Sequence, residues 1–125
     1  MAEFTSPYAR TLGLSFVRTG GRIVVTMAPS ENVEGRPGFL HGGAISGLLD
    51  YAGWLVVHDA IEDGARVKPI GITVDFMRGG KMEPAHASAH IERLGRRIAN
   101  VIVTAWQDDE AKPIARADLK FLIER

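Results

Sequence analysis

The chain has 125 residues, and its 15 Lys or Arg residues balance its 15 Asp or Glu residues. A balanced charge gives no general attraction for nucleic acid or for an anionic membrane. Because the sequence contains no cysteine, disulfide bonds, thiolate catalysis and zinc–cysteine sites are excluded. The length predicts a single domain over residues 1–125 with a core of its own.

Residues 1–10 show little periodicity and are predicted to form weak helix or coil. They lack an apolar segment followed by a small-residue cleavage site, so no secretory signal is expected. The longest apolar run, residues 44–57, is shorter than the ~20 residues of a membrane-spanning helix and contains Asp50. These features predict a cytoplasmic protein that has neither a membrane nor a nucleic acid as a partner.

A β-hairpin is predicted over residues 12–27. Apolar side chains alternate with other residues on both sides of the turn sequence Thr19-Gly20-Gly21, as is typical of two short paired strands. Residues 28–40 are rich in proline, glycine and asparagine and are predicted to form a loop.

Residues 41–60 are predicted to form one long helix that is apolar on nearly every side and therefore enclosed by the fold. Gly47 and Gly53 each weaken a helix by about 1 kcal/mol relative to alanine. Their presence predicts close approach of a neighbouring strand. Asp50 is unexpected in such a helix, because burying a charge without a partner is strongly unfavourable. It is the first functional candidate.

Four further strands are predicted from apolar alternation, over residues 68–78, 85–94, 97–108 and 112–124. A hairpin, one buried helix and four strands indicate an α+β fold. In it, an antiparallel sheet of five or six strands wraps around the central helix. Such a sheet keeps open edges, which favour pairing with another chain. A homodimer or homotetramer is therefore expected.

The sequence His41-Gly42-Gly43 is followed by Asp50, nine residues after the histidine, and later by the strand ITVDFMR at residues 72–78. This pattern resembles the hotdog-fold acyl-CoA thioesterases, and most closely their phenylacetate-pathway branch, over about residues 13–123. The resemblance implies a hotdog fold with sites at the interface of two subunits. It also implies hydrolysis of an acyl- or aryl-CoA thioester to the free acid and coenzyme A, without any cofactor beyond the coenzyme A of the substrate.

The resemblance assigns roles to individual residues. The backbone N–H of Gly42 would polarise the thioester carbonyl, Asp50 of the other subunit would act as nucleophile or general base, and His41 would help to position the substrate. Nucleotide contacts are implied near the turns at Arg78 and at residues 95–97. The candidate substrate-binding residues are Gly43, Gly35, Asn32, Trp54, Phe76, Arg78, Lys81, Arg96 and Arg97.

The chemistry of these residues agrees with that assignment. The first N–H groups of a helix have no internal acceptor and lie at the positive end of its dipole, which suits an oxyanion at Gly42. Asp50 lies about 12 Å further along the same axis, at 1.5 Å per residue. One helix cannot easily bring both groups to one carbonyl carbon, whereas two antiparallel helices across a dimer can. The spacing therefore predicts a composite site.

One position departs from the family pattern. Family members commonly carry Asn or Gln six residues before the histidine, where this chain has Gly35, and the nearest amide is Asn32. Either Asn32 reaches the site, or water takes that place, or hydrolysis is weak. The alternative functions are a hotdog protein that binds acyl-CoA without cleaving it, and a hotdog hydratase or dehydratase. The sequence leaves open whether the acyl group is an aryl or a medium-chain group.

Asp50 and His41 also have purely structural interpretations. Asp50 could be a structural carboxylate that is hydrogen-bonded by Ser46 or by the backbone of a partner subunit, and His41 could be a helix cap or a loop histidine. His86 and His90 are four residues apart on a predicted strand, which places them on one face about 13 Å apart. No metal site is therefore expected.

Overall fold

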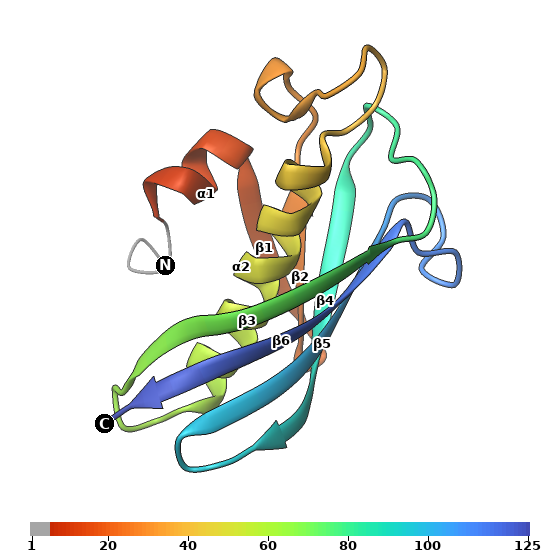
Figure 1. Ribbon diagram of the computed structural model, residues 1–125. Helices are drawn as coiled ribbons and strands as arrows, with labels where there is room; N and C mark the ends of the chain where they lie inside the picture. Colours follow the sequence, from red (N-terminus) through yellow and green to blue (C-terminus); the bar gives the residue numbers. More distant parts are fainter. Residues whose placement is uncertain (1–5) are drawn as a thin grey trace.

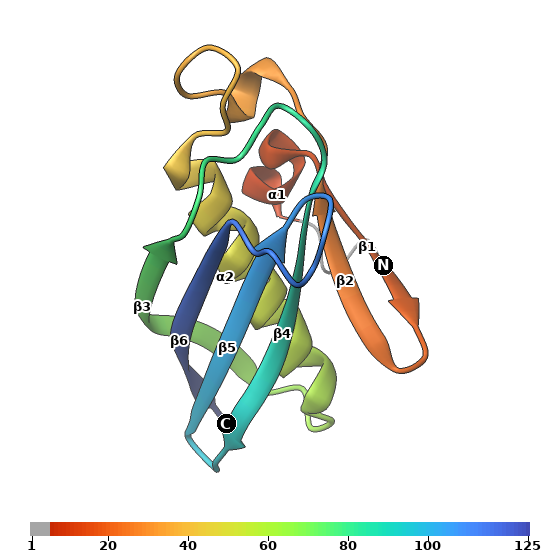
Figure 2. The same cartoon turned by 90° about the vertical axis from the view of Figure 1, so that its right-hand side faces the viewer.

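The structure, a computed structural model, describes residues 6–125. Six strands form one antiparallel sheet in the order β1-β2-β4-β5-β6-β3, and the sheet bends around the long helix α2 (Gly42–Ala60) (Figures 1 and 2). This confirms the predicted α+β hotdog fold. The part of the predicted N-terminal helix or coil at residues 1–5 lies outside the described residues.

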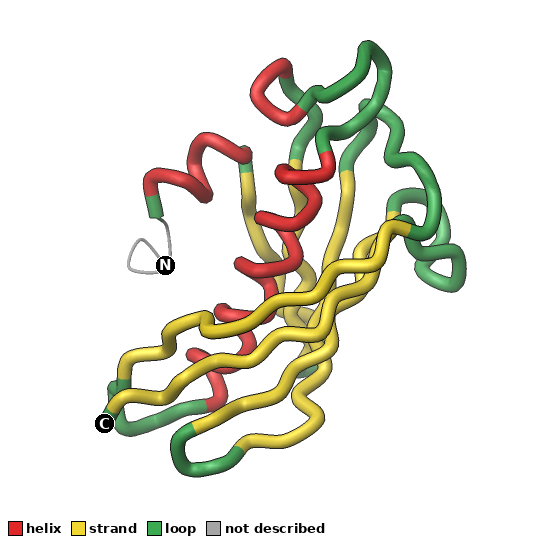
Figure 3. Tube along the Cα trace, in the orientation of Figure 1, coloured by secondary structure: helices red, strands yellow, loops and turns green. Residues whose placement is uncertain are grey.

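The six strands follow the predicted order, and their ends lie within three residues of the predicted bounds. The elements besides α2 are α1 (Pro7–Leu12), β1 (Leu14–Thr19), β2 (Arg22–Met27), the short 3-10 helix η2 (Glu31–Val33), β3 (Arg66–Phe76), β4 (Ala85–Leu94), β5 (Ile98–Trp106) and β6 (Ala115–Glu124). The loops before α2 and after β3 lie together at the end of the molecule where α2 begins (Figure 3), joined by the Leu40 N–H, which donates to the Gly80 carbonyl at 2.8 Å. That end carries one part of the candidate site.

Helix α1 is a well-bounded element rather than coil. Ser6 accepts the Ala9 N–H at 3.1 Å, and Pro7 occupies the first turn, where a missing N–H costs nothing. Gly13 ends the helix with φ +71°, the left-handed conformation that glycine adopts without strain. Leu12, which was predicted to begin the hairpin, instead closes α1 and is buried.

Helix α2 is enclosed by the sheet on one side and by α1 on another. At Gly53, an added Cβ atom would lie 3.2 Å from Val103 and 3.3 Å from Phe121, so the predicted close approach of strands is confirmed there. At Gly47 that prediction is wrong, because the neighbours are Tyr8 and Leu12, which belong to α1. The sheet alone does not cover the helix.

The two sheet edges are β1 and β3, and β3 is the longer and carries more exposed large apolar side chains. Ile70, Ile72 and Phe76 are each about half exposed. The register pairs Ile72 with the buried Leu119, which places the two side chains on the helix side of the sheet. Pro69 lacks an N–H group, which is tolerated at an edge, and a bulge follows it. Among the described residues, no helix is long and apolar enough to cross a membrane.

Candidate active site

The first turn of α2 leaves a backbone donor, the Gly42 N–H, open to a ligand. His41 is the N-cap, and its Nδ1 accepts the Gly43 N–H at 2.8 Å. Because Nδ1 is the acceptor, the neutral ring carries its proton on Nε2. The His41 carbonyl accepts the N–H groups of Ala44 and Ile45. The Gly42 N–H has no acceptor among residues 6–125. His41 is thus the cap, and the helix begins one residue later than predicted.

Gly42 lies against the end of β3. A Cβ atom at this position would be 3.4 Å from the Phe76 ring, which is 55% exposed. The missing side chain leaves the N–H accessible at the positive end of the helix dipole, where negative charge is stabilised. This corner can therefore accept a carbonyl oxygen or an oxyanion.

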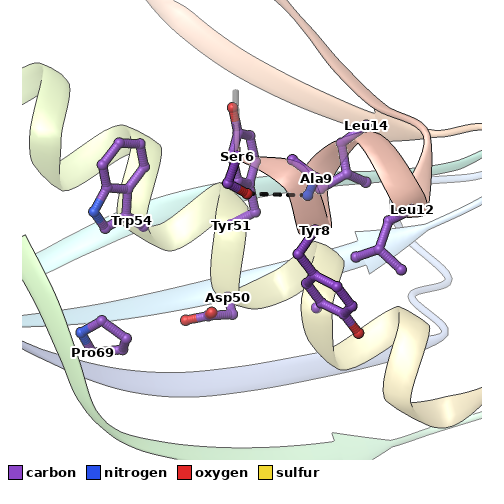
Figure 4. A pocket seen from close by; sticks show the side chains of 10 residues that line it. Ser6, Tyr8, Ala9, Leu12, Leu14, Asp50, Tyr51, Trp54 and Pro69 are labelled. Atoms are coloured by element: carbon purple, nitrogen blue, oxygen red, sulfur yellow. Dashed lines mark hydrogen bonds between the residues drawn. The ribbon is translucent and has the colours of Figure 1, made fainter. Parts of the chain in front are cut away.

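Asp50 lies in the middle of α2 and is half-buried. It lines a cavity of about 330 Å³ between α2, α1 and the start of β3 (Figure 4). Burial raises the pKa of the Asp50 carboxyl, and neither a charge nor a hydrogen bond from the described residues offsets that shift. Ser46, the alternative partner considered for Asp50, instead donates to the Gly42 carbonyl at 2.9 Å. The other main lining side chains are Tyr8, Leu12, Leu14, Tyr51, Trp54 and Pro69.

Trp54 forms a fixed wall of this cavity. Its Nε1 donates to the Val67 carbonyl of β3 at 3.0 Å, and its ring stacks on His58 at a centroid distance of 4.8 Å. The hydrogen bond holds α2 against the start of β3, and the stacking on His58, one turn further along α2, fixes the orientation of the ring. The cavity beside Asp50 therefore has a defined shape on this side.

Gly35 lies directly beside the helix cap. A Cβ atom there would be 3.0 Å from the His41 Cα atom, so a longer side chain would require the backbone to move. The Asn32 amide is engaged elsewhere, since its Nδ2 donates to the Thr11 carbonyl of α1 at 3.3 Å. In this conformation neither residue directs an amide toward Gly42.

The basic candidates form two groups at opposite ends of the sheet. Arg78 and Lys81 line a small cavity of about 220 Å³ after β3, near the start of α2. Arg96 and Arg97 lie in the β4–β5 turn, where the Arg96 carbonyl accepts from Arg125 at 3.3 Å. The ten-residue strand β6 runs between the two ends, which corresponds to about 30 Å at ~3.3 Å per residue. One subunit does not bring both groups to one ligand.

The candidate residues thus fall into separate regions of one subunit. Gly35, His41, Gly42, Gly43, Phe76, Arg78 and Lys81 gather where α2 begins. Asp50 and Trp54 share the cavity further along α2. Asn32 contacts α1, and Arg96 and Arg97 lie at the far end of the sheet.

Sequence reasoning missed the contribution of α1. Tyr8, Leu12 and Leu14 line the Asp50 cavity. The sequence did not indicate this, because the first ten residues show no useful periodicity. The signals that could have found this helix are Ser6-Pro7 at its start and Gly13 at its end.

The histidines outside the site have local partners. The Nδ1 atom of His86 lies 2.8 Å from the Thr26 hydroxyl, and His90 lies 3.2 Å from Glu92. Within residues 6–125, no group of three or more His, Cys, Asp or Glu side chains is arranged to hold a metal ion.

Solved structures share this fold. A phenylacetic acid degradation-related protein from Ralstonia eutropha JMP134 superposes with a TM-score of 0.83, with 24% identity over 94% of this chain and 91% of that one. A Bacillus halodurans protein solved with CoA gives 0.89, with 20% identity over 97% and 80%. A Haemophilus influenzae thioesterase gives 0.89, with 23% identity over 98% and 85%. At these identities the likeness establishes the fold.

Among curated proteins, no significant match is found. The sequence model of the thioesterase superfamily, in contrast, matches residues 37–114. The matched segment is more than half of the chain and contains the start of α2, Asp50 and all of β3. The chain therefore belongs to the thioesterase superfamily and has the hotdog fold.

Proposed function

We propose that the protein is an acyl-CoA thioesterase, active as a homodimer, that hydrolyses an acyl- or aryl-CoA thioester to the free acid and coenzyme A. The observation that carries the proposal is Asp50, a half-buried carboxyl with a raised pKa that borders an apolar cavity. Membership of the thioesterase superfamily supports hydrolysis of a thioester. The structural neighbour solved with CoA supports coenzyme A as the thiol part.

The dimer is needed because Asp50 and the Gly42 N–H lie about 12 Å apart along one helix. Antiparallel pairing of two β3 edges would set the Phe76 end of one subunit opposite the Pro69 end of its partner. Phe76 lies against Gly42, and Pro69 lines the cavity that contains Asp50. Pairing centred near residues 72–73 would therefore bring Gly42 of one subunit to the partner's Asp50.

Two further features of β3 support this pairing. Ile70, Ile72 and Phe76 are about half exposed in one subunit and would be covered in the dimer; burial of apolar area stabilises by about 25 cal/mol per Å². The same pairing would bring the Arg78 turn of one subunit toward the Arg96 turn of the other. The two basic groups would then serve one ligand, and guanidinium groups suit the 3′-phosphate and diphosphate of coenzyme A.

The reaction follows from these positions. The Gly42 N–H would donate to the thioester carbonyl oxygen and stabilise the negative charge that develops on it. The partner's Asp50 would either attack the carbonyl carbon and form a mixed anhydride that water then hydrolyses, or accept a proton from a water that attacks the same carbon. In both routes the carbon–sulfur bond breaks and the sulfur leaves as the thiol after taking up a proton.

The direct test is Asp50→Asn, measured as release of free thiol from a panel of short, long and aromatic acyl-CoAs. We expect kcat to fall at least ~100-fold, which corresponds to about 2.7 kcal/mol of transition-state stabilisation. Asp59→Asn is the matched control, because Asp59 lies on the same helix but is exposed and paired with Arg18. Light scattering should give the same oligomer mass for all forms. Near-full turnover by Asp50→Asn would refute the proposal.

A second candidate function is binding of acyl-CoA without hydrolysis. The observation that favours it is Gly35, where family members commonly carry an amide and where a side chain would be crowded against the His41 backbone. Calorimetry would then show tight binding of an acyl-CoA, while no thiol is released over several hours.

A further inference from the structure

The Gln107 side chain fastens the connection between β3 and β4, residues 77–84. Gln107 comes directly after β5, and its Oε1 atom accepts the Lys81 N–H at 3.0 Å. Its Nε2 atom donates to the carbonyl groups of Lys81 at 2.8 Å and of Glu83 at 3.1 Å. The Lys81 carbonyl also accepts the Glu83 N–H at 2.8 Å, which makes a tight turn. Both polar atoms of the Gln107 amide are thus bonded to the backbone of this turn.

The same connection contacts the residues that lead into α2 (Figure 3). Lys81 and Phe39 form an antiparallel β-bridge, and the Leu40 N–H donates to the Gly80 carbonyl at 2.8 Å. An added Cβ atom at Gly80 would lie 3.1 Å from the Leu40 Cδ1 atom, so the two segments are closely packed there. His41, the cap of α2, is the next residue. The turn that is bonded to the amide is therefore joined directly to the start of α2.

The start of α2 has a buried support and an exposed one. On the first side, the His41 N–H donates to the Val33 carbonyl at 2.7 Å, and Val33 is fully buried. On the second side lies the connection 77–84, in which most residues are exposed. Segments with few buried apolar contacts open easily. Hydrogen bonds such as those of Gln107 therefore decide where the second support lies.

We propose that Gln107 is a positioning residue, which holds the first turn of α2, through Lys81 and Leu40, where the Gly42 N–H meets the thioester carbonyl. The inference rests on the proposed hydrolysis, in which Gly42 is the donor. Gln107 itself does not touch the substrate. Its effect on the rate arises because an oxyanion donor must be in place before the charge develops, and a misplacement of 1 Å costs up to ~10²-fold in rate.

The test measures kcat and KM for Gln107→Met and Gln107→Glu on an acyl-CoA that the wild type cleaves. Methionine keeps the length of the side chain without its hydrogen bonds, and glutamate sets a carboxylate beside two carbonyl groups. Both changes should lower kcat about tenfold, because the donor is displaced rather than removed, and outright removal costs ~10²–10³-fold. KM should stay within about twofold of the wild-type value. Measurement well below each melting temperature keeps the folded fraction from limiting kcat.

Glu110→Gln is the matched control. Glu110 lies in the connection between β5 and β6 that begins with Gln107, and it forms an exposed ion pair with Arg22. The substitution thus removes a contact of the same connection without touching residues 77–84. Both kcat and KM should remain at their wild-type values.

Hydrogen exchange of single amides, followed by NMR, tests the inference without catalysis. In Gln107→Met the Leu40 N–H should exchange about tenfold faster, because the Gly80 carbonyl that it bonds is held less firmly. The amides of β5 and β6 should keep their wild-type rates, and Glu110→Gln should leave the Leu40 rate unchanged.

The outcomes separate this inference from the proposed hydrolysis. If the wild type cleaves acyl-CoA and kcat is unchanged in both Gln107 variants, the inference is wrong whatever the Leu40 rate. A rise in KM alone would also refute it, since Gln107 would then serve binding through Lys81. Faster exchange throughout the sheet would mean a general loss of stability and would refute it as well. If the wild type releases no thiol but Leu40 exchange rises only in the Gln107 variants, hydrolysis fails and the positioning of α2 stands.

Discussion

The two sides of α2 differ in what lies against them. On the sheet side, Gly53 meets Val103 and Phe121, both fully buried. On the α1 side, Gly47 meets Leu12 and the largely exposed Tyr8. The first contact is between a helix and a continuous sheet. The second is with a helix of six residues that has few other contacts.

This difference indicates that one side of α2 mainly contributes to stability and the other mainly to function. Close packing against a sheet leaves little freedom to adjust, because interiors are packed as densely as organic crystals. The α1 side instead encloses a cavity and the Asp50 carboxyl, whose burial raises its pKa. Changes on the sheet side should therefore cost stability, and changes on the α1 side should alter activity.

Phe121→Ala should give the largest loss of stability. Phe121 is fully buried against Gly53, and truncation of a buried phenylalanine costs about 3–5 kcal/mol. Urea denaturation measures the loss. Lys120→Ala, an exposed neighbour on β6, should change the free energy of unfolding by less than about 0.5 kcal/mol. A loss below about 1 kcal/mol for Phe121→Ala would mean that the sheet side is not tightly packed.

Alanine at the two glycines provides a matched pair on one helix. Both substitutions gain about 1 kcal/mol of helix propensity. At Gly53 the new methyl meets side chains that are held inside the sheet, and such overpacking costs roughly 1–3 kcal/mol. At Gly47 it meets the Leu12 Cδ1 atom and the exposed Tyr8 ring, both on the short helix α1, which can shift more easily than the sheet. Thermal unfolding should show a loss of stability for Gly53→Ala and almost no change for Gly47→Ala. Equal losses would mean that the two sides of α2 tolerate an added methyl group equally.

The pKa of Asp50 predicts a smaller effect that depends on pH. Because burial raises the folded-state pKa above the unfolded value, Asp50 lowers stability progressively as the pH rises from the unfolded-state pKa through the folded-state pKa, and this cost is absent where the carboxyl is protonated in both states. Asp50→Asn should therefore stabilise the protein at neutral pH, with a gain that shrinks in acid, as melting temperatures across pH would show. If the gain in melting temperature were the same at every pH, burial of the Asp50 charge would not be its cause.

Enzyme activity should depend on the protonation state of Asp50 in the same way. The wild-type kcat/KM should fall as the pH drops through the raised pKa of Asp50, since the protonated acid can act neither as nucleophile nor as base. A pH–rate profile that stays flat well below neutrality would separate Asp50 from the chemical step.

Asp59, nine residues further along α2, should give the smallest effect and the opposite sign. Its hydrogen bonds from Arg18, at 2.7 and 2.9 Å, lower the pKa of the Asp59 carboxyl. The resulting stability is present above the unfolded-state pKa and is lost as the pH falls through the lowered value. Asp59→Asn should therefore lower the melting temperature slightly at neutral pH and not in strong acid. The ion pair between Arg18 and Asp59 is exposed, so added salt should weaken it.

Much of the fold could be predicted because its elements repeat at regular intervals. Alternating apolar residues located the strands, and the apolar run with Asp50 located α2. Helix α1 was predicted only as weak helix or coil over residues 1–10, because six residues are too few to show a helical period and its signals are caps rather than periodicity. The strand predicted beside Gly53 is present, but the neighbour of Gly47 was predicted wrongly, since a glycine shows that something comes close without showing what.

The sequence by itself determined the order of the elements, the superfamily pattern of His41-Gly42-Gly43 with Asp50, and the separation of these groups along one helix. It did so because period, capping and rise per residue are local properties of the chain. Only the tertiary structure decided that α1 closes the cavity beside Asp50, that Gly35 lies against His41, and that the basic turns sit at opposite ends of the sheet. Those relations join residues far apart in the chain, and packing alone brings them together.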